Sequence, residues 1–355
     1  MAEEELLFIR YFYWILLVAL VLQVVISFCQ YLSPRFPVNI WNKLLSVLLI
    51  AGVSMYIGGR DICIGADTDV YWEYYEELRT TSRFWTYGEP VFYFFMFVFA
   101  RLFTFQAFLT FCAFVYIGGA YLGMKRFFSG YALYSLLLFF ISPDFFLYGI
   151  NVIRNGFAAS VFLMSFYWWG KSSWKMYGMM LLAVLCHFSM LLPLLVFVAS
   201  RNWKSTLFLL IVWTVSLILY FANFTIGAQL GYILPDFGRV NQYFNDQAEE
   251  PLTALINFFV YGASPVFAGI YYVYFKKYND RVYLHLLNVY ILLNAFYVQF
   301  MDIKFAVRFA YLSEFLMPIV LIYPLLKERI WPLRFWVLSL LLLSVFFIKA
   351  VKILF

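Results

Sequence analysis

Charged side chains are scarce in this sequence. Only 12% of its 355 residues are Asp, Glu, Lys or Arg, whereas a soluble globular domain carries about 25%. A chain with so little charge and with 65% hydrophobic residues is not a soluble globular protein. Its length is taken up by apolar sequence, so a soluble catalytic or nucleic-acid-binding domain does not fit, and we expect no nucleic acid as a partner.

Residues that bind metals or form disulfides are also few. The four cysteines are Cys29, Cys63, Cys112 and Cys186, and three of them lie in apolar runs. No pair of cysteines has the spacing of an external disulfide or of a zinc site. We therefore expect neither a metal site nor a cofactor, and the cysteines indicate no redox compartment.

Apolar runs long enough to cross a bilayer, at about 20 residues each, fill most of the chain. The runs are unbroken, which excludes the alternating polarity of a transmembrane β-barrel. We predict an all-α, polytopic membrane protein that forms one domain over residues 1–355, with about 11–13 transmembrane helices. The predicted spans are 11–29, 40–58, 90–104, 106–124, 131–149, 154–170, 206–222, 254–275, 282–301, 305–326 and 333–349, with a less regular stretch at 176–199.

Two longer, acidic loops interrupt the spans at about 59–89 and 223–253. The short loops instead hold clustered cations, which the positive-inside rule assigns to the cytoplasm. The two acidic loops are therefore predicted to face outward. The cationic clusters are Lys125 with Arg126, Lys171 with Lys175, Arg201 with Lys204, Lys276 with Lys277 and Arg281, and Lys327 with Arg329 and Arg334.

This orientation fixes how many membrane crossings separate one loop from the next. In two places the number of apolar runs differs from the number of crossings required. Two runs separate the first acidic loop from the next cationic cluster, where one crossing is needed. Lys175 and Arg201 are both inward only if the stretch between them turns back. We therefore predict that a segment near 90–104 and the segment 176–199 are re-entrant or broken, and broken helices often mark binding sites.

Carboxylates at the outward ends of the spans are candidates for chemistry. Asp67 and Asp69 follow Arg60 just outside a span, and Glu89 precedes Pro90 at the start of another. Carboxylates beside an arginine can orient sugar hydroxyls or act as a general base. A helix cap and a solvated surface are the competing explanations.

Arg154 and His187 are ionisable residues in apolar surroundings, where such residues are rare and functional by default. Arg154 is close to the small residue Gly156, which lets a ligand approach a guanidinium suited to phosphate. A lipid anchor for Arg154 and a structural hydrogen bond for His187 are the alternatives. Arg308 and Arg239 add cations to the outward side, where an anionic partner would balance them.

Taken in order, these fragments resemble the EpsG/Wzy-like family of bacterial polysaccharide polymerases, over residues 59–312. The sequence departs from the family at Asn155, where many relatives have glutamine, and at Ala66, where threonine is common. The motifs that carry the resemblance are Gly65-Ala66-Asp67-Thr68-Asp69-Val70-Tyr71, Glu89-Pro90, Ile153-Arg154-Asn155-Gly156-Phe157-Ala158, His187-Phe188-Ser189, and Arg308 with Tyr311.

The resemblance implies a glycosyltransferase of the bacterial inner membrane whose active site faces the periplasm. Such an enzyme polymerises lipid-linked oligosaccharide repeat units of O-antigen or a related surface polysaccharide. It moves the growing glycan from polyprenyl pyrophosphate to the non-reducing end of a new lipid-linked unit. Membrane lipid surrounds it, and a chain-length regulator is a partner that the sequence leaves open.

The candidate residues take two roles in this chemistry. A lipid-linked oligosaccharide flippase, which also needs cations for pyrophosphate, and a membrane O-acyltransferase, which shares a buried histidine, are the alternative functions. The candidates for the base that activates the acceptor hydroxyl are His187, Asp67 and Glu89. The candidates for substrate binding are Arg60, Asp69, Tyr71, Arg154, Asn155, Ser189, Arg239 and Arg308, among which the arginines suit pyrophosphate.

Overall fold

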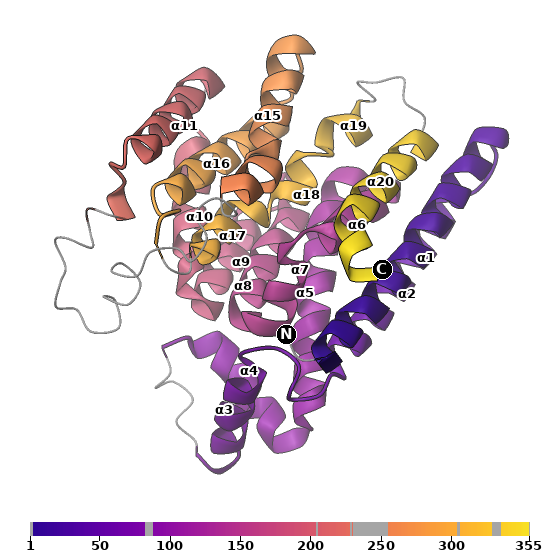
Figure 1. The fold of residues 1–355 in the computed structure, drawn as a ribbon, viewed down its shortest axis with the longest axis vertical. Helices are drawn as coiled ribbons and strands as arrows, with labels where there is room; N and C mark the ends of the chain where they lie inside the picture. Colours follow the sequence, from indigo (N-terminus) through magenta and orange to yellow (C-terminus); the bar gives the residue numbers. More distant parts are fainter. Residues whose placement is uncertain are drawn as a thin grey trace. The chain divides into compact units, whose positions relative to one another are not determined.

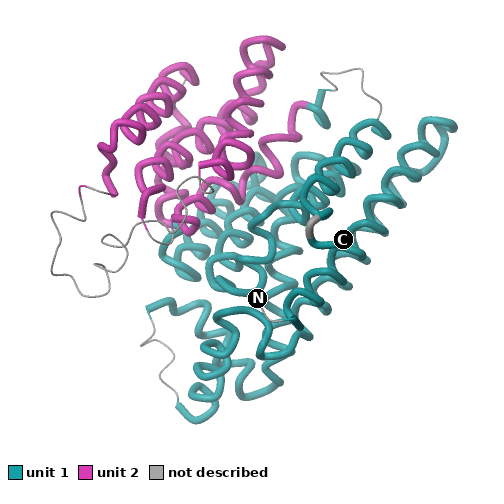
Figure 2. The backbone as a smooth tube through the Cα atoms, viewed as in Figure 1, with its two compact units in different colours: residues 1–190, 325–355 teal, residues 191–324 magenta. Residues whose placement is uncertain are grey.

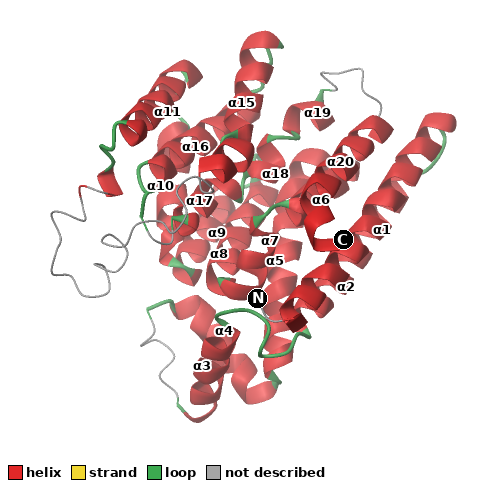
Figure 3. Ribbon diagram, in the orientation of Figure 1, coloured by secondary structure: helices red, strands yellow, loops and turns green. Residues whose placement is uncertain are grey.

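The computed structural model describes residues 3–81, 88–203, 205–227, 229, 255–303, 306–328 and 335–354. Over these residues the chain forms helices without a β-strand, which confirms the predicted all-α class (Figure 1 and Figure 3). The chain divides into two compact units, Met1–Met190 with Leu325–Phe355 (unit 1) and Leu191–Pro324 (unit 2) (Figure 2).

Unit 1 contains the first half of the chain and its last helix. Among its elements, η3 is a turn of π-helix, and η2, η4 and η5 are 3-10 turns. The helices described in unit 1 are α1 (Glu3–Leu32), α2 (Val38–Gly58), α3 (Thr68–Thr80), α4 (Pro90–Leu102), α5 (Phe105–Phe128), η2 (Ser129–Tyr131), α6 (Ala132–Ile141), α7 (Asp144–Phe146), η3 (Leu147–Asn151), α8 (Ile153–Ser165), η4 (Phe166–Trp168), α9 (Ser173–Cys186), η5 (Phe188–Met190) and α20 (Phe335–Leu354).

Unit 2 is joined internally by buried amide groups. Asn294 accepts a hydrogen bond from Trp213 Nε1 at 2.8 Å and donates to the Gly262 carbonyl at 3.0 Å. Such bonds hold apolar helices together in a membrane. The helices described in unit 2 are α10 (Leu191–Ser200), α11 (Thr206–Phe221), η6 (Phe258–Gly262), α15 (Ser264–Ile270), η7 (Tyr271–Phe275), α16 (Arg281–Val298), α17 (Val307–Glu314) and α18 (Met317–Val320), while α19 (Tyr323–Lys327) begins in unit 2 and ends in unit 1.

Several helices are long and apolar enough to cross a membrane, as expected of a polytopic membrane protein. Among the described residues there are five of these by length and composition, and up to seven if each of two bent helix pairs counts as one span. The five are Glu3–Leu32, Val38–Gly58, Phe105–Ile141, Arg281–Val298 and Val307–Lys327, and the bent pairs are Asp144–Asn151 with Ile153–Trp168 and Leu255–Gly262 with Ser264–Phe275.

Helix α4 is unbroken, so of the two alternatives predicted near 90–104 a break inside the helix is wrong, and a re-entrant course stays a prediction. Its 13 residues extend about 20 Å at 1.5 Å per residue, which is less than the bilayer core of about 30 Å. Phe99 of α4 stacks on Phe111 near the start of α5 at 4.8 Å, and Arg101 donates to the Leu78 carbonyl of α3 at 3.1 Å. Helix α4 is therefore too short to cross a membrane alone, and it packs beside α3 (Figure 1).

The interruption predicted within 176–199 is confirmed, and it lies at His187. Helix α9 ends at Cys186, His187 has an extended backbone with φ −155° and ψ 123°, and the short turn η5 follows. Backbone at membrane depth departs from a regular helix where it is buried in protein or lines a cavity. The break therefore gives the histidine side chain a fixed place just beyond the end of a helix.

The continuous span predicted over 131–149 is wrong. Helix α6 ends at Ile141, because Pro143 has no N–H to continue the helical bonding. The Lys349 ammonium of α20 satisfies carbonyl groups at this break: it donates to Ile141 at 2.8 Å and to Ser142 at 2.9 Å. The half-buried Lys349 of α20 thus stabilises the end of α6.

A second discontinuity comes directly before α8, in the interval between the predicted spans 131–149 and 154–170. The segments Asp144–Asn151 and Ile153–Trp168 meet at 113°. A Cβ atom on Gly156 would overlap the backbone carbonyl of Tyr148. The bend therefore depends on glycine at position 156.

We expect Gly156→Ala to lower the free energy of unfolding by about 1–3 kcal/mol, because a side chain cannot move a backbone carbonyl aside without distorting the bend. Gly178→Ala in α9 is the matched control, since nothing lies within 4 Å of its Cβ position and alanine favours a helix. Thermal unfolding of the purified variants in detergent provides the measurement. Equal melting temperatures for the two variants would contradict the close approach.

Helices α5 and α8 lie side by side and run in the same direction. Gly119 and Gly123 of α5 lie against the backbone of Ser160 and Leu163 of α8, where a side chain would crowd the carbonyl groups. This four-residue spacing of glycines is typical of apolar helices in close contact.

Cations gather at one end of this helix pair. Arg126, near the end of α5, donates from Nε to a backbone carbonyl just beyond η4 at 2.9 Å. Lys171 and Lys175 border the turn into α9. Helix α9 then returns along α8, and its last residues come beside the first turn of α8. Arg154 and His187 therefore lie at the opposite end of these helices from the cations.

Candidate functional site

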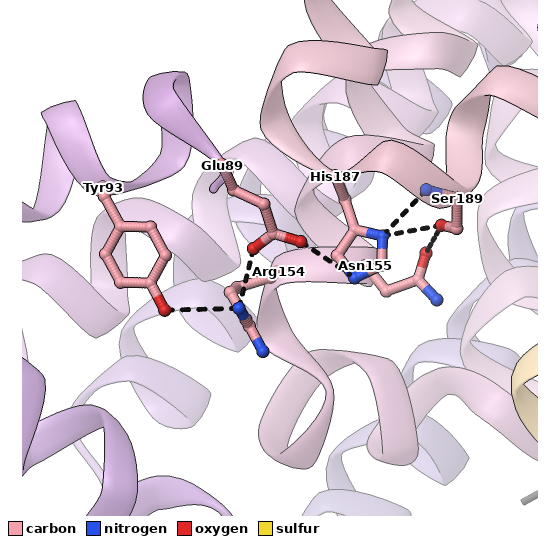
Figure 4. Close-up of polar contacts among 6 residues, drawn as sticks. All are labelled: Glu89, Tyr93, Arg154, Asn155, His187 and Ser189. Carbon is pink, nitrogen blue, oxygen red and sulfur yellow. Dashed lines mark hydrogen bonds and ion pairs between the residues drawn. The ribbon is translucent and has the colours of Figure 1, made fainter. Parts of the chain in front are cut away.

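Three ionisable side chains from different parts of unit 1 meet at this opposite end (Figure 4). Glu89 Oε2 accepts a hydrogen bond from Arg154 Nη1 at 2.7 Å, and Glu89 Oε1 lies 3.3 Å from His187 Nε2. The carboxylate is the most enclosed of the three, with 14% of the Glu89 side chain exposed, against 23% for His187 and 33% for Arg154. The site therefore has a half-buried carboxylate, with the arginine more open to solvent.

Each of these side chains is placed by the end of a helix. Glu89 directly precedes Pro90, whose fixed φ suits the first turn of α4. Arg154 is in the first turn of α8, after the bend, and His187 immediately follows α9. Helix ends are suitable positions because the chain changes direction there and the side chains can converge.

Aromatic rings enclose Arg154. Its Nη1 also donates to the Tyr93 hydroxyl at 3.2 Å. The guanidinium carbon lies 5.9 Å from the ring centres of both Tyr71 and Tyr93, within the range of a cation–π interaction. The guanidinium is therefore held in one orientation while part of it stays exposed.

His187 is held from its other side. Its Nδ1 lies 2.7 Å from Ser189 Oγ and accepts from the Ser189 backbone N–H at 3.3 Å. Ser189 Oγ also lies 3.1 Å from Asn155 Oδ1. A continuous series of hydrogen bonds thus runs from Asn155 in α8 through Ser189 and His187 to Glu89 (Figure 4).

The surroundings of Glu89 act on its protonation. Burial raises the pKa of Glu89 above its ordinary value, and the charge and hydrogen bond of Arg154 oppose that rise. A glutamate whose pKa is raised is a better proton acceptor when ionised than one in water.

Arg60, predicted to bind pyrophosphate, is instead buried among backbone carbonyl groups. Its guanidinium donates to Ile57 at 2.8 Å, to Ile150 at 3.0 Å and to Thr68 Oγ1 at 3.3 Å. Burial lowers the pKa of Arg60 to about 10. Through these hydrogen bonds the Arg60 side chain joins the end of α2 to the turn before α8. The predicted contact of Arg60 with a substrate stays a prediction.

The loop between α2 and α3 is also hydrogen-bonded to the turn before α8. The Ala66 N–H donates to Asn151 Oδ1 at 2.9 Å. Gly65 has a φ of +96°, and a Cβ atom there would come within 2.7 Å of that amide oxygen. We name the contacts of Arg60, Gly65 and Asn151 the loop anchor.

The acidic residues of this loop lie apart from the described hydrogen bonds of the Glu89 cluster. Asp67 is half-buried and precedes α3 without a capping hydrogen bond from its side chain. Asp69 is exposed, and its carboxylate accepts from the Val70 N–H at 2.8 Å. Tyr71 is buried with its ring beside Arg154. Their predicted contacts with substrate stay predictions.

The remaining candidates are not part of unit 1. Arg308 is exposed on α17 of unit 2, and Arg239 lies outside the described residues.

Two residues that the sequence did not single out are Tyr93, which belongs to the site, and Asn151, which belongs to the loop anchor. Tyr93 lies one helical turn after Glu89, and that spacing is the signal that could have indicated it.

Chemically, the cluster combines a proton acceptor with an anion-binding group. Glu89 can accept a proton, and Arg154 presents charged N–H donors to an oxyanion from a partly exposed position. Across the described ranges, no three His, Cys, Asp or Glu residues are grouped so that they could hold a metal ion.

Comparison with known families gives one match. A family model described as the EpsG family matches residues 43–354, which is nearly the whole chain. The matched region includes Glu89, Arg154 and His187. No curated protein and no solved structure matches the chain.

Proposed function

The chain belongs to the EpsG family, which is of the Wzy-like polymerase type, and on that premise we propose that it polymerises lipid-linked oligosaccharide repeat units. The donor is a glycan on polyprenyl pyrophosphate, and the acceptor is the non-reducing end of a second lipid-linked unit. The product is a longer chain of O-antigen or a related surface polysaccharide.

The convergence of Glu89, Arg154 and His187 at one end of α8 and α9 is the observation that carries this proposal. Transfer of a glycan between oxygen atoms needs an acceptor for the hydroxyl proton and a cation for the leaving group. This cluster has both within hydrogen-bonding distance.

The same helices support an outward-facing site. Arg126, Lys171 and Lys175 lie at the end of α5, α8 and α9 that is remote from the cluster. The positive-inside rule assigns that end to the cytoplasm, so the cluster faces the periplasm of a bacterial inner membrane.

In the reaction, the acceptor hydroxyl loses its proton to the Glu89 and His187 pair as its oxygen bonds to the anomeric carbon of the donor. The bond between that carbon and the pyrophosphate oxygen breaks, and its electrons leave with the polyprenyl pyrophosphate. Arg154 stabilises the added negative charge, as an oriented cation does in a site with little water. The proton is then released to solvent.

Reconstitution into liposomes with purified lipid-linked repeat units tests this function against the flippase alternative. We expect a ladder of elongated products on gel electrophoresis, with repeat units supplied on the side that bears the cluster. Translocation of single units without elongation would overturn the polymerase and favour a flippase.

A further inference from the structure

The hydrogen bonds around His187 bear on which residue of the cluster accepts the proton. A neutral imidazole has one acceptor nitrogen. In His187 this is Nδ1, because the Ser189 backbone N–H, which can only donate, is directed at it from 3.3 Å. The Ser189 hydroxyl lies 2.7 Å from the same nitrogen and donates to Asn155 Oδ1 at 3.1 Å.

The proton on the ring is therefore on Nε2, which faces Glu89 Oε1 at 3.3 Å. Both ring nitrogens of His187 are directed at protein atoms. Glu89 differs, since a carboxylate has about four lone-pair positions. His187 and Arg154 each take one of these, so the carboxylate can still accept a bond from a substrate hydroxyl.

We propose that Glu89 is the base of the reaction and that His187 is a positioning residue, held in its tautomer by the Ser189 backbone N–H. The inference rests on the proposed function. His187 donates to the carboxylate and fixes its rotamer, and Arg154 fixes the other oxygen. Glu89 takes the proton from the acceptor hydroxyl as the glycosidic bond forms.

The titratable and charged groups that interact with Glu89 come from three helices. They are Arg154 of α8, Cys186 and His187 at the end of α9, and Tyr93 of α4. Arg154 and His187 are the groups that donate to the carboxylate, and both favour its ionised form.

Two substitutions of His187 separate a positioning role from a base. Glutamine places an N–H donor near the position of Nε2 but cannot accept the proton, whereas alanine removes the donor. We expect His187→Gln to retain elongation within about tenfold of wild type, since about 1.4 kcal/mol of hydrogen bonding corresponds to tenfold. His187→Ala should be slower, and Ser189→Ala should lose only a few-fold.

The pH profile adds a readout that a merely structural role would not move. Because His187→Ala removes a donor to the carboxylate, the pKa of Glu89 should rise, and the acid limb of the residual activity should move to higher pH. Activity falls below that limb because the protonated carboxyl cannot accept the hydroxyl proton.

His187→Gln as inactive as Glu89→Gln, with both proteins folded by gel filtration and thermal unfolding, would overturn the assignment and make His187 the base. Wild-type protein that fails to elongate repeat units in the same liposomes would overturn the proposed function itself. Retained elongation by His187→Gln, with the shifted acid limb of His187→Ala, supports both.

Discussion

Glu89→Gln is expected to slow chain elongation by about 10²–10⁴-fold, which is the usual contribution of a general base. Glutamine has nearly the shape of glutamate and can accept a bond from Arg154, but its amide does not take up a proton at neutral pH. The loss should appear in the rate constant of single-turnover elongation, measured with repeat units at saturating concentration in liposomes. Thermal unfolding in detergent shows whether the fold is kept.

Two further variants sharpen this expectation. Glu76→Gln is the control for loss of one carboxylate, because Glu76 pairs with Arg79 on the exposed side of α3 at 3.1 Å, and we expect normal elongation from it. Glu89→Asp keeps the charge but shortens the side chain, so it should be intermediate. Elongation at the wild-type rate by folded Glu89→Gln protein would show that Glu89 is not the base.

Arg154→Lys is expected to reduce elongation by about 10²–10³-fold, the range for loss of one oriented donor to a developing oxyanion. Lysine keeps the charge but has no planar fork, so it cannot bond Glu89 and Tyr93 and still present N–H groups to pyrophosphate. The effect should fall mainly on the chemical step when the donor is saturating. Gel electrophoresis of the products should show single repeat units and few long chains.

Arg79→Lys is the matched control for Arg154→Lys, since its guanidinium is exposed and pairs only with Glu76 among the described ion pairs. Arg154→Gln gives a second test through pH. Removal of the cation that opposes the raised pKa of Glu89 should move the acid limb of activity to still higher pH. An unmoved limb in a folded variant would contradict the described contact between the two side chains.

The members of the cluster were recognisable in the sequence, but their contacts were not. Arg154 and His187 stand out because charge is rare in apolar runs, and Glu89 stands out beside Pro90. Glu89 and Arg154 are 65 positions apart, so their contact depends on how α4, α8 and α9 pack. A sequence without packing information contains no signal for that contact.

For Arg60, the sequence did not indicate which kind of group the side chain contacts. An arginine just outside a span has the same appearance in sequence whether it binds phosphate or backbone carbonyls. The carbonyls of Ile57 and Ile150 become available to it because α2 ends and η3 unwinds at that level. Parity of crossings indicated the break at His187, and the end of an apolar run near residue 149 indicated an interruption before α8. Neither indicated the angle of 113° at which the chain bends there.

The loop anchor has a consequence for the interpretation of mutant libraries. Gly65 and Asn151 join the outer loop to the turn that carries Arg154, so damage at either should be transmitted through the backbone to the guanidinium. A screen for loss of polymer would then score Gly65 as strongly as a residue of the reaction centre, although it has no side chain with which to touch a substrate. Loss of polymer in variants of Gly65 or Asn151 would therefore report the connection between this loop and Arg154, and not a role of these residues in the reaction.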